Sequence, residues 1–267
     1  MKVRASIVTY RTDPEELTTC VNSLKAAGVK QVTIVDNSPT DSLRPLCGKL
    51  GADYIFTGKN LGYGAAHNIA LRQSLEQADG EYHLVINSDV YFAPETIMRI
   101  TEFMDAHPEV GQLIPRTVYP DGREQSVVRM LPTPLDVIGR RFLPAGWMRR
   151  RNSRYLLEHV DHSRPFNVAY HQGSFMFLRL DALRRVGLFD ERFFMYPEDI
   201  DLTRRIHEHY QTLFWPGATI THAHRAASYK SLRMLRIHCV NMIRYFNKWG
   251  WFIDPRRRQI NRTLQKV

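Results

Sequence analysis

The chain has 267 residues, of which 43% are hydrophobic, and a formal net charge of +10 at neutral pH. This length and apolar content support a full buried core and exclude an intrinsically disordered protein. The apolar runs are too short to cross a bilayer, and the N-terminus lacks the apolar core of a secretory signal, so we expect a cytoplasmic protein. Three scattered cysteines, Cys20, Cys47 and Cys239, predict buried thiols and exclude a disulfide framework or a zinc knuckle.

The first 77 residues predict an alternation of strands and helices. Residues 3–8 form a predicted strand, and Asp13 caps a helix that continues to residue 24. Short buried strands follow at 32–35 and 54–56, joined by a turn, and a second helix ends near residue 77. This order is typical of an α/β protein with a parallel, doubly wound sheet.

Polar residues follow each of these strands. Thr9 and Tyr10 follow the first strand, Asp36 ends the second, and a loop with Asn60 and Gly62 follows the third. Ligands bind doubly wound sheets at the carboxyl ends of the strands, so these residues should face one crevice.

Residues 82–92 predict a further buried strand that delivers the triplet Asn87-Ser88-Asp89. A carboxylate there can hold Mg²⁺ or Mn²⁺, whose oxygen shell a diphosphate ligand would complete. The alternative is a polar turn after a strand.

Three carboxylates crowd the segment after Pro197, namely Glu198, Asp199 and Asp201. Like charges this close need a cation or a proton to coexist. Acids in a first turn also suit the positive end of a helix dipole, so a plain helix N-terminus is the alternative.

The C-terminal segment carries most of the excess charge. Between residues 225 and 267 there are eleven Lys and Arg residues and one acid, Asp254. Apolar residues at spacings of three and four, with Trp249 and Trp251, favour an amphipathic helix on an anionic membrane surface, which a second basic cluster at 140–151 would extend. The alternative is a helix that packs on the domain or on another subunit and exposes a basic face.

Taken in order, these segments resemble family 2 glycosyltransferases with the nucleotide-diphospho-sugar transferase fold called GT-A, whose sheet is mostly parallel. Within the family the chain looks most similar to rhamnosyltransferase-type members that build bacterial O-antigen and capsule chains. The resemblance covers roughly residues 3–230 and rests on residues 6–10, 34–38, 60–64, 87–89, 173–176, 187–194 and 198–201.

This resemblance implies a catalytic domain at 1–227, with a nucleotide-sugar half at 1–110 and an acceptor half at 111–227, and a basic helical segment at 228–267. It implies dTDP-L-rhamnose as donor, with UDP-hexoses open, and a lipid-linked glycan as acceptor. We expect the protein to work at the inner face of the bacterial cytoplasmic membrane without nucleic acid, and self-association stays open. Residues 115–165, rich in prolines and basic pairs, suit an acceptor-side insertion or lid.

The resemblance also implies roles for individual residues. Asp36 and Thr9 would recognise a thymine or uracil ring, with Tyr10 against the base. Gly173, the first residue of a predicted strand at 173–177, would let the backbone approach the sugar closely, although a packing glycine is the alternative. The other residues expected at the nucleotide sugar are Asn60, Gly62, Asn68 and Asn87.

By the same resemblance Asp89 is the metal ligand and His222 a second ligand. The family often has Asn-Pro-Asp at the triplet, where this chain has Ser88 in the middle. Close members carry an acid after the histidine, whereas this chain has Ala223 and His224, so which histidine contacts the metal stays open. An ordinary hydrogen-bonded histidine is the alternative for His222.

Asp199 is the candidate general base for the acceptor hydroxyl, and a single displacement would invert the anomeric centre. Glu198 would hold the acceptor or raise the pKa of Asp199 through proximity. Asp201 would order the helix start, and Arg204 and Arg205 would pair with these acids.

Two other functions fit less well. A nucleotidyltransferase would need a glycine-rich phosphate loop at residues 9–13, which are Thr-Tyr-Arg-Thr-Asp. A non-catalytic basic membrane adaptor would not need Asp36, Asp89, Asp199 and His222 together.

Overall fold

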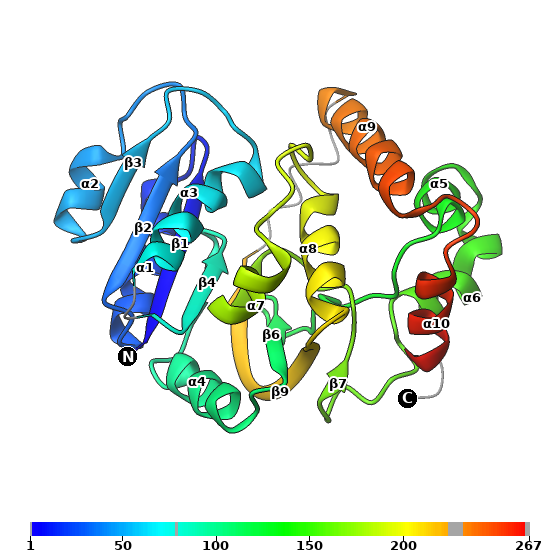
Figure 1. Cartoon of the computed structure of the whole chain (residues 1–267). Coiled ribbons are helices and arrows are strands. Elements are labelled where there is room, and N and C mark those ends of the chain that lie inside the picture. The colour runs from blue at the N-terminus through cyan, green and yellow to red at the C-terminus, as the bar shows by residue number, and fades with distance from the viewer. Residues whose placement is uncertain (1, 78–79, 224–231, 265–267) are drawn as a thin grey trace.

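The computed structural model describes residues 2–77, 80–223 and 232–264. Its centre is a nine-stranded sheet in the order β3-β2-β1-β4-β8-β6-β9-β5, with β7 paired to β9 (Figure 1). The strands are β1 Val3–Thr9, β2 Gln31–Asp36, β3 Asp53–Phe56, β4 Tyr82–Ile86, β5 Val90–Phe92, β6 Val110–Val118, β7 Phe166–Asn167, β8 Phe175–Arg179 and β9 Gln211–His222.

Parallel pairing is confined to β1–β4 and to the pair of β6 with β9. The other neighbours, β4 with β8, β6 with β8, β5 with β9 and β7 with β9, are antiparallel. The predicted single strand at 82–92 is in fact two, because the chain turns at Asn87, whose carbonyl accepts from the Val90 N–H at 3.4 Å. The turn moves β5 across the sheet to β9, opposite His222.

Ten helices lie in the described part of the chain: α1 Pro14–Ala26, α2 Arg44–Lys49, α3 Tyr63–Glu76, α4 Thr96–Ala106, α5 Pro134–Phe142, α6 Ala145–Tyr155, α7 Leu180–Val186, α8 Pro197–His207, α9 Leu232–Trp249 and α10 Pro255–Leu264. As predicted, Asp13 caps α1 by accepting from the Glu15 N–H at 2.8 Å. The turn predicted between β2 and β3 is wrong, since α2 lies there. α2 has only six residues and contains a proline and a glycine, so it lacks the apolar repeat that marks a helix.

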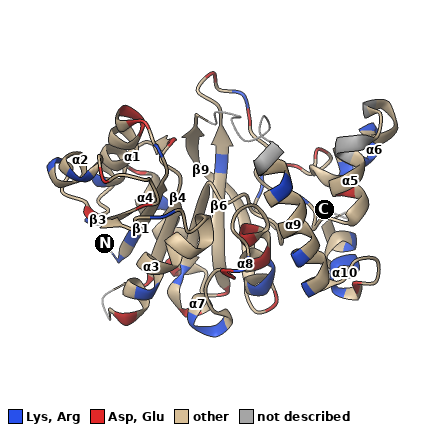
Figure 2. Cartoon of the chain, turned by 90° about the horizontal axis from the view of Figure 1, so that it is seen from above, with Lys and Arg blue, Asp and Glu red and all other residues tan. Residues whose placement is uncertain are grey.

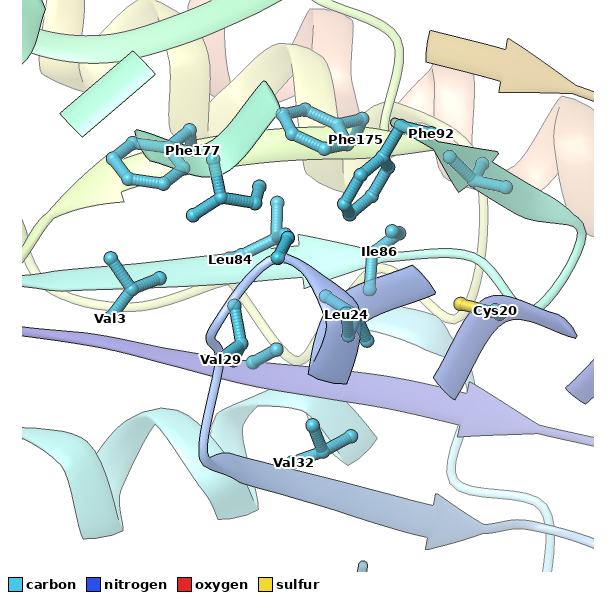
Figure 3. Packing of buried hydrophobic residues seen from close by; sticks show 14 of the residues in the cluster. Val3, Cys20, Leu24, Val29, Val32, Leu84, Ile86, Phe92, Phe175 and Phe177 are labelled. Atoms are coloured by element: carbon cyan, nitrogen blue, oxygen red, sulfur yellow. The ribbon is translucent and has the colours of Figure 1, made fainter. Parts of the chain in front are cut away.

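The sheet has an apolar core on each face. On one face α1 and α4 pack on side chains such as Leu84, Ile86, Phe175 and Phe177 of the strands (Figure 3). On the other face α3, α7 and α8 pack on the alternate residues of β4 and β8. Cys20 and Cys47 are buried as predicted, but Cys239 is exposed on α9, so the prediction for that thiol is wrong.

The C-terminal helices pack on the domain through one face. Met242, Tyr245 and Phe246 of α9 and Ile260 and Leu264 of α10 are buried in a shared cluster with residues of β6, β7 and α8. This packing agrees with the alternative prediction, in which the C-terminal helix packs on the domain and exposes a basic face. No helix in the described residues is long and apolar enough to span a membrane.

Two buried ion pairs tie this segment to α8. Arg204 forms a bidentate pair with Asp254 at 2.8 Å, and Trp249 lies beneath its guanidinium. Asp201 is fully buried and accepts from Arg205, Lys248 and the Trp249 indole N–H. Of the two arginines predicted to pair with the acids of α8, only Arg205 does so, since Arg204 pairs with Asp254. Asp201, which is predicted to order the start of α8, instead binds Lys248 and Trp249 of α9.

Candidate active site

The polar residues at the strand ends lie along one edge of the sheet. Thr9 and Asp36 are register partners at the ends of β1 and β2. Asn87 follows β4, and its N–H donates to the Ser174 carbonyl at 3.0 Å, beside the start of the antiparallel β8. His222 ends β9, which runs parallel to β6, at the same edge. These residues therefore share one edge of the sheet, as the sequence predicts.

The candidate base pocket is built around Asp36. Its buried carboxylate accepts from the Ser38 N–H at 2.9 Å and from the Tyr54 hydroxyl at 2.6 Å. A carboxylate has about four acceptor positions, so a ligand N–H can still bind. The neighbouring Thr9 hydroxyl is buried without a hydrogen-bond partner in the described structure, and the Tyr10 ring is 45% exposed beside it.

Gly62 brings two loops of the site together. It has a φ of 88°, and a Cβ there would meet the Phe194 carbonyl oxygen at 2.2 Å. Asn60 accepts from the Gly62 N–H, and Asn37 donates to the Gly62 carbonyl. Tyr63 N–H then donates to the Phe194 carbonyl at 2.9 Å, so this loop is joined to the one that precedes α8.

The side chain of Asn68, which we predict to lie near the nucleotide, is engaged within the protein. Its amide donates to the Phe189 carbonyl and to Glu191, both at 2.9 Å, and accepts from the Phe189 N–H at 3.0 Å. Both amide hydrogens are therefore used within the protein. Asn68 thus joins α3 to the loop after α7.

Tyr63 lies at the centre of the site, and the sequence interpretation gave it no role. Its buried hydroxyl donates to the Gly173 carbonyl at 2.6 Å and lies 3.0 Å from the Asn87 side-chain oxygen. Burial, and then the nearby carboxylates of Glu198, Asp199 and Asp89, raise the pKa of Tyr63 well above its usual value. The sequence signal that could have marked Tyr63 is its position directly after Gly62, in the loop predicted to bind the nucleotide sugar.

Asp199 and Glu198 begin α8 in different environments. Asp199 accepts from the Gly173 N–H at 2.9 Å and from the Ile200 N–H at 2.8 Å. Burial raises the pKa of Asp199 to about 7, although the two N–H groups and the Arg129 charge lower it. For Glu198, burial and the adjacent Asp199 raise the pKa well above the usual range, and one carboxyl oxygen, Oε2, lacks a hydrogen-bond partner among the described residues.

Backbone geometry supports this arrangement. Tyr196, directly before α8, has a φ of 94°, which is unusual for a residue with a side chain. Strained backbone of this kind concentrates at functional sites. Gly173 leaves space for Asp199, since a Cβ at Gly173 would lie 3.3 Å from the Asp199 Cβ.

Asp89 and His222 form the candidate metal pair. The His222 Nε2 lies 3.3 Å from an Asp89 carboxylate oxygen. Gln125 donates its amide N–H to the His222 carbonyl at 2.7 Å, so its amide oxygen is the atom 3.0 Å from His222 Nδ1. In a neutral ring Nδ1 then carries the hydrogen, and the Nε2 lone pair faces Asp89.

This donor set fits a divalent cation. A carboxylate and an imidazole lone pair that face each other need a cation or a proton between them, and both are common metal ligands. The contact of His222 Nδ1 with Gln125 is the kind of outer hydrogen bond that sets the tautomer of a metal-binding histidine. His224, the other candidate ligand, lies outside the described residues.

Arg129 and Gln125 are residues of the candidate site that the sequence interpretation missed. Arg129 lowers the pKa of Asp199 and lies 3.2 Å from the Tyr170 hydroxyl. Both residues lie between β6 and α5, in the segment predicted as an acceptor-side insertion, far in sequence from the residues they contact. No local motif marks either residue.

A family model described as "Glycosyl transferase family 2" matches residues 5–187. The chain belongs to this family. It is 31% identical over 235 residues to an N-acetylglucosaminyl-diphospho-decaprenol L-rhamnosyltransferase of Mycobacterium tuberculosis. The match covers 83% of this chain and 75% of that relative. Rhamnosyltransferase WbbL of Escherichia coli is 26% identical over 183 residues, 66% of each chain. The resemblance to rhamnosyltransferase-type members is thereby confirmed, and the protein is a glycosyltransferase.

The fold of this glycosyltransferase also matches solved structures. The mannosyltransferase PcManGT from Pyrobaculum calidifontis, solved with GDP-Man and Mn²⁺, has a TM-score of 0.60 and 17% identity, and the match covers 92% of this chain and 63% of that one. The predicted GT-A fold is confirmed.

Proposed function

We propose that this protein is an inverting, metal-dependent glycosyltransferase that moves L-rhamnose from dTDP-L-rhamnose to a hydroxyl of a lipid-linked glycan. The observation that carries the reaction class is the meeting of Asp199, Tyr63 and the Asp89–His222 pair at one sheet edge. The donor and the acceptor class are supported by the relative that acts on a diphospho-decaprenol acceptor with L-rhamnose.

Asp199 acts as the general base in this proposal. A base works best when its pKa lies near the working pH, and burial brings the pKa of Asp199 to about 7. Its two backbone hydrogen bonds favour the ionised form, whereas Glu198 has neither of these bonds and lies beside Asp199. Asp199 therefore takes the proton of the acceptor hydroxyl as the glycosidic bond of the donor breaks, while Glu198 stays protonated and can donate to the acceptor.

Asp89 and His222 would hold Mg²⁺ or Mn²⁺. The bound ion would neutralise charge on the departing diphosphate. Asp89 and His222 are two protein ligands, so the diphosphate and water would fill the remaining positions. Asp36, Thr9 and Tyr10 hold the pyrimidine at the far end of the donor, with the carboxylate of Asp36 accepting from the ring N–H.

We assign residues 1–227 to the catalytic domain and residues 228–267 to a basic segment, whose helices α9 and α10 pack on the domain. Work on a lipid-linked acceptor requires access to a membrane surface. The exposed face of α9 and α10 carries basic residues, which suits contact with the cytoplasmic face of a bacterial membrane (Figure 2).

A donor panel tests the proposal. The purified protein is incubated with dTDP-L-rhamnose, UDP-glucose, UDP-N-acetylglucosamine and GDP-mannose, with Mn²⁺ or with EDTA, and nucleotide release is measured with a diphospholipid-linked acceptor. We expect release from dTDP-L-rhamnose that EDTA abolishes. Release only from a UDP-hexose would contradict the donor assignment, and release from none of the four would contradict the function.

A further inference from the structure

We propose that a groove between α5, α6 and α10 binds the diphosphate and the first prenyl units of the lipid-linked acceptor. The acceptor class rests on the proposed function. The groove, which has a volume of about 830 Å³, is lined by these three helices and by the turn between α9 and α10. Its predominant charge is positive, because the lining arginines are Arg150, Arg151, Arg154, Arg257, Arg258 and Arg262.

Part of this positive charge is free to meet a ligand. Asp136, the acidic residue of the lining, is paired with Arg151 at 2.6 Å, and Arg257 is buried against Asp254. Arg150, Arg154 and Arg262 are exposed and have no acidic partner in the described part of the chain. Guanidinium groups bind phosphate oxygens through paired N–H donors, so these three arginines suit a diphosphate.

The groove also has exposed apolar side chains in its lining. Trp147 is 82% exposed and Phe252 is 74% exposed, and both line the groove. Eight of the ten large hydrophobic side chains exposed in the described structure lie between residues 135 and 147 or between 240 and 253. An exposed apolar patch beside arginines fits a ligand that joins an anionic head to a hydrocarbon chain.

The groove lies on the acceptor side of the catalytic centre. Figures 1 and 2 both place α5, α6 and α10 beyond α8, on the side opposite the nucleotide half formed by β1–β4. Met130 lines the groove, and the charge of the preceding residue along the chain, Arg129, lowers the pKa of Asp199. A sugar attached to a diphosphate in the groove would therefore point along this segment toward the base.

Binding of farnesyl diphosphate tests the groove without any need for turnover. Trp147 and Trp251 both line the groove, so intrinsic fluorescence reports occupancy. We expect farnesyl diphosphate to bind at least tenfold more tightly than farnesol or inorganic diphosphate, since both parts of the ligand are recognised. The double variant Arg154→Glu/Arg262→Glu should lose at least tenfold in affinity, and the neutral Arg154→Gln/Arg262→Gln a smaller factor.

Arg99→Glu is the matched control, because Arg99 is exposed on α4, away from the groove. Unchanged affinity in both double variants, with thermal unfolding like the wild type, would overturn the proposal. The proposal would also be overturned if the variants bind phosphatidylglycerol vesicles more weakly but bind monomeric farnesyl diphosphate as the wild type does. That result would indicate a membrane-contact surface instead.

A second titration distinguishes failure of the groove proposal from failure of the proposed function. Titration of the wild-type protein with dTDP and Mn²⁺ reports the donor site alone. Nucleotide binding without farnesyl diphosphate binding contradicts the groove and leaves the transferase proposal standing. Farnesyl diphosphate binding that depends on Arg154 and Arg262 supports the groove even when no donor in the panel is used.

Discussion

Asp199 and Glu198 are adjacent residues that differ in how the fold treats their charge. The backbone N–H groups of Gly173 and Ile200 both point at the Asp199 carboxylate. For Glu198, burial and the charge of Asp199 both favour the protonated form. Two neighbouring carboxyl groups with pKa values pushed apart are the usual arrangement of an acid and base pair.

Asp199→Asn should reduce kcat by about 100-fold or more and leave the donor Kd within about threefold. The amide cannot accept the acceptor proton, whereas the donor binds elsewhere; removal of a general base typically costs 10²–10⁴-fold. Turnover and calorimetric titration of the nucleotide measure the two effects. Asp181→Asn, an exposed acid on α7, is the control, and more than a tenth of wild-type turnover would remove Asp199 from this role.

The pKa of Asp199 also predicts how activity depends on pH. Because the base must be ionised, kcat should rise with pH and reach half its plateau near pH 7. A profile between pH 5 and 9 in a buffer series, with the product quantified by mass spectrometry, checks this. A flat profile over that range would be incompatible with a base of this pKa.

The same group predicts an effect on stability. A carboxyl whose folded pKa is raised from 3.8 to about 7 contributes stability below pH 4, and that contribution is lost as pH rises through 7. The unfolding temperature of Asp199→Asn relative to the wild type should therefore be higher at pH 8 than at pH 4, because the amide loses one backbone hydrogen bond at both values but carries no charge at pH 8. Differential scanning calorimetry at both values measures the difference, and an equal shift at the two pH values would contradict the assignment.

Asp89→Ala should weaken metal-dependent donor binding by at least tenfold, because it removes one of the two protein ligands proposed for the cation. Gln125→Leu should also weaken this binding, by roughly tenfold, since it frees His222 Nδ1 from its hydrogen bond. Titration with nucleotide in Mn²⁺ and in EDTA measures both. Wild-type activity that survives EDTA would show that arginines, not a cation, neutralise the leaving group.

At the scale of elements, α10 is a structural part of the domain. Ile260 and Leu264 are buried, and Asn261 exchanges hydrogen bonds with both backbone groups of Leu131. Arg257 donates to the carbonyls of Gly250 and Trp251. We therefore expect truncation after Asp254 to destabilise the protein rather than only to weaken membrane contact.

The expected loss on truncation is about 3–6 kcal/mol of unfolding free energy, from two buried aliphatic side chains and several hydrogen bonds. Urea unfolding measures it. Arg256→Ala, which removes an exposed charge without touching this packing, is the control and should be close to neutral. A truncated protein as stable as the wild type would show that α10 does not hold the domain.

Elements with strong local signals could be predicted from the sequence, and the others could not. The strands β1 to β4 and the helices α1 and α3 have apolar runs bounded by caps or glycines. The break between β4 and β5 has no such signal, because β5 is defined by its long-range pairing with β9. α6 carries four arginines among its eleven residues, so it lacks the apolar stripe that would mark it. α5 does have local signals, namely Pro134 at its start and a capping box of Thr133 and Asp136, and the sequence interpretation missed them.

At the scale of the whole molecule, the candidate site combines residues from both halves of the chain. The acids at the strand ends could be predicted, since the carboxyl ends of strands are where α/β sheets bind ligands. Gln125, Arg129 and the position of Tyr63 could not, because each is defined by contacts with residues that are far away in sequence. The groove formed by α5, α6 and α10 likewise joins segments about 100 residues apart.

The most direct measurement is the structure of the product. The protein is incubated with Mn²⁺, dTDP-β-L-rhamnose and N-acetylglucosaminyl-diphospho-farnesol, and the product is analysed by mass spectrometry and NMR. An inverting transferase gives the acceptor plus one deoxyhexose in α linkage, and Asp199→Asn gives none. A β-linked product, or rhamnose released only to water, would contradict single displacement onto a lipid-linked acceptor.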